Sequence, residues 1–235
     1  MLLTAGFGER MRPLTEQLPK PAIPVLGRPM AMQLVGWLGR AGAERVVCNT
    51  HHLPGVLRDT LGDGSAFGPA RVEYSHEETL LGTGGGLRQA RPLLGGGGTL
   101  VVSNGDSLSD IDLPAALAAH RASGLPATLV LAPHRPGYSE VQVDRRERVV
   151  SLAGEPPADP EEVRASYLFC GTHLIEEEVL DLIPPDGPSD IVRHVYRALA
   201  AERRLGCYVH RGFWWEFGSP SLYLEGSLIL LERSF

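Results

Sequence analysis

A single lysine, Lys20, is the most informative residue of this sequence, because arginine supplies all the others among its 22 basic side chains. Lys20 lies between Pro19 and Pro21, a few residues after a loop that contains Gly6 and Gly8. An ammonium is a compact point charge on a flexible stem, whereas a guanidinium is a wide planar fork. We interpret Lys20 as a ligand of phosphate oxygens in a narrow pocket. The alternative is a solvated lysine retained by chance.

The segment before this lysine, residues 3–15, predicts a strand that runs into an anion-binding turn. Gly6 and Gly8 allow backbone N–H groups to approach an anion closely, and Arg10 adds positive charge. The segment is not a dinucleotide-binding fingerprint, because Met11 occupies the place of the third glycine. It is not a Walker-type phosphate loop either, since no Gly-Lys-Ser or Gly-Lys-Thr follows.

Two further segments contribute carboxylates. Asp106 ends the segment Ser103-Asn104-Gly105-Asp106, directly after an apolar run that predicts a buried strand. A carboxylate at the carboxyl end of a strand is well placed to bind a metal ion, although a lone aspartate there is more often a turn or cap residue. Glu216 follows Trp214 and Trp215 in an aromatic segment, where core packing accounts for one of the two tryptophans.

Together these segments resemble those of the sugar-1-phosphate nucleotidyltransferases, or nucleotide-sugar pyrophosphorylases. That family opens with a glycine-rich loop, an arginine, Pro-Leu-Thr and Pro-Lys-Pro at this spacing. The resemblance covers nearly the whole chain. In layout it is greatest to the short bacterial N-acetylmuramate-1-phosphate uridylyltransferases and mannose-1-phosphate guanylyltransferases. The resemblance implies an enzyme that joins a sugar 1-phosphate to a nucleoside triphosphate (NTP), with UTP or GTP favoured, and releases pyrophosphate.

The resemblance also implies a role for each matching residue. It assigns catalysis to Arg10, Lys20 and Asp106, and a catalytic Mg²⁺ to Asp106 and Glu216. Because Glu216 stands in place of the family's shorter aspartate, a shifted metal or an intervening water is expected. Nucleotide binding is implied for Leu3, Ala5, Gly6, Gly8, Glu9, Arg10, Lys20, Glu78, Leu81, Gly82, Thr83, Asn104 and Gly105. Sugar binding is implied for Tyr138, Glu155, Gly171 and Trp214.

The elements that must position these residues indicate an α/β fold. Alternating strands and helices are typical of right-handed crossovers and a mostly parallel sheet, with ligands at the carboxyl ends of the strands. We therefore expect a Rossmann-like three-layer α/β/α arrangement with a smaller sugar-binding β extension. Strands are expected at residues 1–5, 45–49, 72–75, 99–103 and 127–132, and helices at residues 29–40, 54–61, 84–94 and 113–123.

In the second half of the chain the regular alternation of strands and helices gives way to a different pattern. A hairpin is predicted from residues 140–144 and 149–152, followed by a strand at 167–175, an amphipathic helix at 191–203, a strand at 205–210 and a helix at 220–232. We expect one domain over residues 1–235, with a nucleotide-binding half at 1–133 and a sugar-binding half at 134–235. No C-terminal β-helix is expected.

Composition and charge restrict the classes of partner and the cellular location that we expect. The net charge of −6 argues against a nucleic-acid partner bound by bulk electrostatics. No apolar run approaches about 18 residues and no signal peptide is visible, so no membrane partner is expected. Cys48, Cys170 and Cys207 lack metal-binding spacing and indicate reduced thiols. We expect a cytoplasmic monomer or homodimer that acts in nucleotide-sugar biosynthesis for the bacterial cell envelope.

Two alternative functions remain open. Glu216 and Pro156, which replaces a lysine of the family's Glu-Lys-Pro sequence, would suit a regulator that binds nucleotides or nucleotide sugars without turnover. Without a second lysine, Arg135 or Arg211 is expected to bind the sugar phosphate. A phosphocholine-type cytidylyltransferase would need an aromatic cage, for which only two neighbouring tryptophans and nearby tyrosines are available. Pyrophosphate release with a panel of substrates distinguishes these alternatives.

Overall fold

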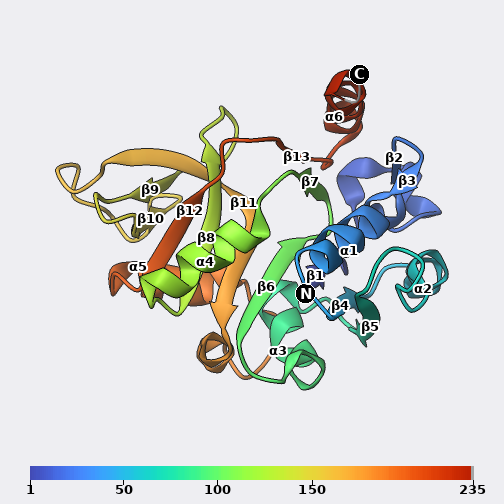
Figure 1. The fold of residues 1–235 in the computed structure, drawn as a ribbon, viewed down its shortest axis with the longest axis horizontal. Helices are drawn as coiled ribbons and strands as arrows, with labels where there is room; N and C mark the ends of the chain where they lie inside the picture. The colour runs from blue at the N-terminus through green and yellow to red at the C-terminus, as the bar shows by residue number, and fades with distance from the viewer. Residues whose placement is uncertain (234–235) are drawn as a thin grey trace. The chain divides into compact units, whose positions relative to one another are not determined.

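The computed structural model describes residues 1–233 as two compact units (Figure 1). Unit 1 comprises Met1–Leu80, Asn104–Asp110 and the chain from Phe213 onward, and unit 2 comprises Leu81–Ser103 and Ile111–Gly212. The last two residues of the expected domain lie outside the described residues. The division between nucleotide-binding and sugar-binding halves at residue 133 stays a prediction.

Unit 1 is organised around three parallel strands in the order β1-β4-β5. These are β1 (Leu2–Leu3), β4 (Arg45–Thr50) and β5 (Arg71–His76). β4 is buried on both faces from Val46 onward, as expected for a strand of a parallel sheet. Helices α1 (Met30–Arg40) and α2 (Pro54–Leu61) occupy the connections between them, and α1 packs on β4 with a stripe of buried residues.

The remaining elements of unit 1 are short, except for the last helix. Two antiparallel ribbons are formed by β2 (Pro24–Val25) with β3 (Arg28–Pro29), and by β7 (Ser107–Ser109) with β13 (Trp214–Glu216). Single 3₁₀ turns occur at Glu9–Met11, Leu14–Glu16 and Lys20–Ala22, and helix α6 (Pro220–Arg233) ends the described chain. The sequence patterns did not indicate the ribbons, because two or three residues carry too little periodicity.

Unit 2 is built on one long strand, β11 (Ala165–Glu176). It pairs antiparallel with β6 (Thr99–Asn104), β8 (Ala127–Pro133) and β9 (Val141–Val143). β8 also pairs parallel with β12 (Leu205–Val209), and β9 pairs with β10 (Val149–Leu152) as the predicted hairpin. The expected α/β class, with a mostly parallel central sheet flanked by helices and a β extension, is confirmed. None of the described helices is both long and apolar enough to cross a membrane.

The helices of unit 2 show why some boundaries follow from sequence. α4 (Leu113–Ser123) begins where the Asp112 side chain accepts a hydrogen bond from Ala115 N (2.9 Å) and ends at Gly124, which has φ 63°. Unit 2 also contains helix α3 (Gly82–Leu94) and a 3₁₀ helix at Glu177–Leu182. The helix expected at 191–203 is instead a π-helix, Val192–Tyr196, followed by α5 (Arg197–Ala201).

The π-helix accompanies a buried polar contact. Tyr196 is fully buried, and its hydroxyl forms a hydrogen bond with Nδ1 of His173 on β11. His173 is 1% exposed, and burial lowers the pKa of its imidazole from 6.5 to about 3. The folded state therefore holds His173 neutral, because burial disfavours its charged form.

This buried imidazole predicts a pH dependence of stability. Above pH 6.5 neither state of His173 is protonated, so its contribution is constant. Below pH 6.5 the unfolded chain binds a proton that the folded chain does not bind until about pH 3. We expect His173 to remove about 2 kcal/mol of unfolding free energy between pH 6.5 and 5. Urea unfolding of wild type and of His173→Gln at pH 6.5 and pH 5 measures this loss of unfolding free energy. Equal pH slopes in the two proteins contradict this account.

Helix α6 provides a test of packing in unit 1. A Cβ on Gly226 would lie 2.3 Å from Trp215 Cδ1 and 2.9 Å from Phe217 Cε1. Replacing a helical glycine by alanine ordinarily stabilises a protein by about 0.5–1 kcal/mol, but overpacking costs about 1–3 kcal/mol. We expect Gly226→Ala to lower the free energy of unfolding by about 1–2 kcal/mol in urea. The control is Gly55→Ala in α2, where nothing lies within 4 Å of the added Cβ and stability should not fall. Equal stabilisation of both variants would show that α6 does not pack closely on Trp215.

Candidate functional site

The main chain of unit 1 holds Asp106 beside the end of β1. Gly105 N donates a hydrogen bond to Leu3 O (2.9 Å). A Cβ on Gly105 would lie 2.7 Å from Thr4 Cγ2 and 2.9 Å from Leu3 O, so a side chain at this position would force the two segments apart. The backbone contact therefore places the next residue, Asp106, at the carboxyl end of β1, where parallel strands present ligands.

The glycine-rich loop that leaves β1 has a fixed conformation. Gly8 has φ 65°, and its carbonyl accepts hydrogen bonds from Met11 N (2.8 Å) and from the Thr15 hydroxyl (3.0 Å). A Cβ on Gly8 would lie 2.8 Å from Thr15 Cγ2, so close approach and positive φ both require glycine. Gly6 is exposed, and nothing lies within 4 Å of the position of its missing Cβ. The loop thus leaves the main chain open at Gly6, as an anion-binding turn requires.

Lys20 lies against Asp106. Its Nζ is 2.5 Å from Asp106 Oδ2, and the two side chains are 12% and 30% exposed. Pro19 is extended and Pro21 is buried in the 3₁₀ turn that begins at Lys20, so the backbone on both sides restricts the lysine. An ammonium has three donors. Lys20 can therefore hold Asp106 and still contact a phosphate oxygen.

Glu216 joins this site through the β7–β13 ribbon. Glu216 pairs with Ser107, and Phe217 N donates to Asp106 O (2.8 Å), so the two carboxylate residues lie on adjacent segments. Glu216 Oε1 and Arg10 Nη2 lie 3.1 and 3.0 Å from the position that a Cβ of Gly218 would occupy. The Arg10 and Glu216 head groups therefore both border the space that Gly218 leaves open.

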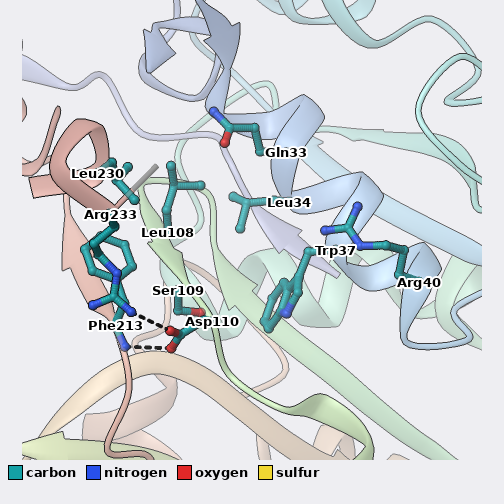
Figure 2. A pocket seen from close by; sticks show the side chains of 10 residues that line it. All are labelled: Gln33, Leu34, Trp37, Arg40, Leu108, Ser109, Asp110, Phe213, Leu230 and Arg233. Carbon is teal, nitrogen blue, oxygen red and sulfur yellow. Dashed lines mark hydrogen bonds and ion pairs between the residues drawn. The ribbon is translucent and has the colours of Figure 1, made fainter. Parts of the chain in front are cut away.

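Figure 2 shows the opposite end of the ribbon, which is tied down by Asp110. The Asp110 carboxylate accepts hydrogen bonds from Phe213 N (2.6 Å) and from Arg233 (3.0 Å), and Asp110 N donates to Phe213 O (3.1 Å). The Arg233 guanidinium lies over the Phe213 ring, 5.2 Å from its centre. Trp37 of α1 lines the pocket of about 220 Å³ beside them. These contacts fix the register of the ribbon.

A buried hydrogen-bond network, which the sequence analysis did not predict, holds the strand end from which the glycine-rich loop begins. Thr4 N donates to Asn49 Oδ1 (2.7 Å), and Asn49 Nδ2 donates to Glu77 Oε1 (2.7 Å). Asn49 and Glu77 are 4% and 0% exposed. His51 donates a hydrogen bond to Glu77 O and His52 donates one to Thr15 O, so each histidine contacts a separate backbone carbonyl. A polar Asn49 ending an apolar strand was the available signal.

The other nucleotide-binding candidates are divided between the units. Unit 1 contains Glu9 and Glu78, which are exposed, Leu3 and Asn104, which are half-buried, and Ala5, which is buried. Unit 2 contains Leu81, Gly82 and Thr83 at the start of α3. There, Leu81 O accepts from Ser189 N (2.7 Å), Thr83 Oγ1 accepts from Ile191 N (2.9 Å), and a Cβ on Gly82 would lie 2.6 Å from Ser189 O. Their roles in nucleotide binding stay predictions.

Three of the four sugar-binding candidates belong to unit 2. Glu155 forms an ion pair with Arg197, Gly171 has φ 73° where β11 bulges, and Tyr138 is half-buried. The fourth, Trp214, belongs to unit 1 and is only 4% exposed, which fits the core-packing alternative better than a sugar contact. Their roles stay predictions, as do those of Arg135 and Arg211 in binding the sugar phosphate.

Comparison with known proteins identifies the family. The family model described as nucleotidyl transferase matches residues 1–233. The chain belongs to the nucleotidyl transferase family. It is 38% identical to an N-acetylmuramate alpha-1-phosphate uridylyltransferase of Neisseria meningitidis, over 93% of this chain and 92% of that protein. The resemblance inferred from the motifs is thereby confirmed.

A second relative is longer than this chain. The mannose-1-phosphate guanylyltransferase of Mycobacterium tuberculosis is 35% identical over 99% of this chain, which spans 64% of that protein's length. Among solved structures, HddC from Yersinia pseudotuberculosis has a TM-score of 0.78 at 17% identity, covering 97% of both chains. A putative glucose-1-phosphate thymidylyltransferase from Bacillus anthracis also reaches 0.78, at 20% identity, covering 97% of this chain and 93% of that one. These likenesses show the nucleotidyltransferase fold.

The space at Gly218 gives a direct test of the site. An added Cβ would lie 3.0 Å from Arg10 Nη2 and 3.1 Å from Glu216 Oε1, so in Gly218→Ala these head groups must give way by a few tenths of an ångström. Because a misplacement of about 1 Å in a catalytic site costs about a hundredfold in rate, a smaller shift costs less. We expect pyrophosphate release to fall by roughly threefold in Gly218→Ala, and the change in thermal stability to be smaller than in Gly226→Ala. Gly55→Ala serves as the activity control. Full activity in Gly218→Ala would show that the positions of the Arg10 and Glu216 side chains do not matter for the reaction.

Proposed function

We propose that this protein is a sugar-1-phosphate nucleotidyltransferase, which converts an NTP and a sugar 1-phosphate to a nucleotide sugar and pyrophosphate. The observation that carries the proposal is the Lys20–Asp106 ion pair beside the glycine-rich loop, where a Cβ on Gly8 would lie 3.2 Å from Lys20 Cβ. Arg10 and Glu216 converge in the same unit. Relatives named as guanylyl- and uridylyltransferases support GTP or UTP as the nucleotide.

The reaction needs little covalent chemistry from the protein. An oxygen of the sugar phosphate, already ionised near neutral pH, attacks the α-phosphorus in line while pyrophosphate leaves, so no general base is required. Positioning and charge neutralisation supply most of the catalysis in such phosphoryl-type transfers. Lys20 and Arg10 would bind the phosphate oxygens as charge builds up, and the main chain at Gly6 would donate hydrogen bonds to them.

The donor set of the site fits Mg²⁺. Asp106 and Glu216 offer hard anionic oxygens. Among residues 1–233 no group of three or more His, Cys, Asp or Glu side chains could hold a metal ion, so a site here would rest on two carboxylates. Mg²⁺ is commonly bound by one or two carboxylates, with water and substrate phosphates completing the octahedron. Asp106 and Glu216 would hold such an ion, which supplies Lewis-acid polarisation of the phosphate oxygens. In its absence Lys20 neutralises Asp106.

Substitution of Lys20 and Asp106 tests the proposal. Lys20→Arg keeps the positive charge but not the compact ammonium, and Asp106→Asn keeps the shape of the side chain but not its charge. Each should lower turnover by roughly two to four decades, since such groups contribute about 3–5 kcal/mol in the transition state. The assay is pyrophosphate release from UTP or GTP with a panel of sugar 1-phosphates.

The matched control is Asp59→Asn, an exposed aspartate of α2 that should retain wild-type turnover. Wild-type activity in Lys20→Arg would reject the requirement for an ammonium. If wild type binds nucleotide but releases no pyrophosphate with any sugar 1-phosphate, the alternative of a binding protein without turnover holds instead.

A further inference from the structure

Unit 2 contains an arginine-rich cavity where the turn between β9 and β10 meets the turn between α5 and β12. Its volume is about 430 Å³. Every residue that lines it is charged, and the basic ones are Arg145, Arg146, Arg148 and Arg203. Because no apolar side chain lines the cavity, an apolar ligand would gain little contact there. The lining therefore points to a charged ligand.

The backbone of the β9–β10 turn is held in place. Asp144 Oδ1 accepts hydrogen bonds from Arg146 N (2.8 Å) and Arg148 N (3.0 Å), so this carboxylate closes the turn. Glu147 O accepts a hydrogen bond from Cys207 N (3.1 Å), which ties the turn to β12. The turn thus presents its arginines to the cavity from a fixed backbone.

Arg148 and Arg203 are held against each other, although they come from distant segments. Arg148 Nη1 donates a hydrogen bond to Arg203 O (2.7 Å). Arg203 has φ 57°, a left-handed conformation that residues with a side chain keep only where the surrounding contacts impose it. A guanidinium has five N–H donors, so both arginines retain donors for a ligand.

The carboxylates of the cavity leave part of its positive charge unpaired. Asp144 is occupied by the main chain of the turn, and Glu162 forms an ion pair with Arg203. Within residues 1–233 the Arg145 and Arg146 side chains form neither an ion pair nor a hydrogen bond, and Glu161 is the other carboxylate of the lining. Two like charges that face one cavity repel each other, and an anion bound between them removes this repulsion.

A chain of phosphates fits this lining better than a carboxylate compound does. Guanidinium forks bind both phosphate and carboxylate oxygens through pairs of parallel hydrogen bonds. A polyphosphate carries charged oxygens along its whole length, so each of several arginines can contact it. A carboxylate compound also brings apolar carbon, for which the lining offers no partner.

We propose that this cavity is an anion-binding site, and that its ligand is a polyphosphate chain, either inorganic pyrophosphate or the phosphates of a nucleotide. Arg145 and Arg146 bind the chain, while Arg148 and Arg203 hold its other oxygens. The cavity shares no residue with the candidate site of unit 1, so this proposal goes beyond the proposed function and does not depend on it.

Hydrogen exchange followed by mass spectrometry tests the proposal, because it reports on each segment of the chain separately. Wild type is titrated with inorganic pyrophosphate and with UTP, without divalent cations and at an ionic strength held constant with sodium chloride. We expect slower amide exchange at residues 144–148 and 203–207. Protection by pyrophosphate shows that the free chain suffices, and protection by UTP alone assigns the ligand to a nucleotide.

The test variant carries Arg145→Gln and Arg146→Gln, which remove two exposed side chains without partners. The midpoint of the titration, measured at residues 203–207, should rise by at least about tenfold, since hydrogen bonds between ionised groups are the strong ones. The matched control carries Arg121→Gln and Arg193→Gln. These exposed arginines of unit 2 lie outside the cavity, and the control should keep the wild-type midpoint.

Four results would overturn the proposal. They are the absence of protection with both ligands, protection by citrate in place of pyrophosphate, an unchanged midpoint in the test variant, and an equal rise of the midpoint in the control. If the test variant does not fold, Arg145→Gln alone should raise the midpoint by at least about threefold; an unchanged midpoint overturns the proposal as well. None of these results bears on the proposed function, which pyrophosphate release measures.

Discussion

The pairing of β7 with β13 is the constraint on which the candidate site of unit 1 depends. Asp106 and Glu216 lie far apart in the sequence, and the ribbon brings their backbones into adjacent segments. Its register is fixed at the other end by the Asp110 carboxylate, which holds both Phe213 N and Arg233. A slip of one residue would turn the Glu216 side chain to the opposite face. The anchor at Asp110 therefore determines where the second carboxylate lies.

A second constraint is electrostatic. Asp106 would stand next to the bound phosphates, and Lys20 compensates its charge at 2.5 Å. The buried chain from Thr4 through Asn49 to Glu77 fixes the strand end from which the loop starts. Polar groups in such a network are costly to leave unpaired, so the network specifies one loop conformation. Rigidity of this kind is what a reaction driven by positioning requires.

The sequence predicted what local chemistry determines. Lys20, Asp106 and the loop glycines were singled out by residue type and spacing, and the expected helix at 113–123, followed by Gly124, is confirmed as α4. The β7–β13 ribbon, the part played by Gly218 and the π-helix at Val192 were not predictable, because each depends on contacts between distant segments. Glu77 was missed for the same reason, because its carboxylate is paired with Asn49 of a neighbouring strand.

The central claim is that Asp106 and Glu216 together form one divalent-cation site. Titration of Mn²⁺ in the presence of a non-hydrolysable UTP or GTP analogue, followed by electron paramagnetic resonance, measures it most directly. The account predicts one bound Mn²⁺ per chain in wild type and in Glu216→Asp, with binding weakened at least tenfold in Glu216→Gln, because a neutral amide oxygen is a poorer ligand for a hard cation. Wild-type Mn²⁺ affinity in Glu216→Gln would contradict the two-carboxylate site.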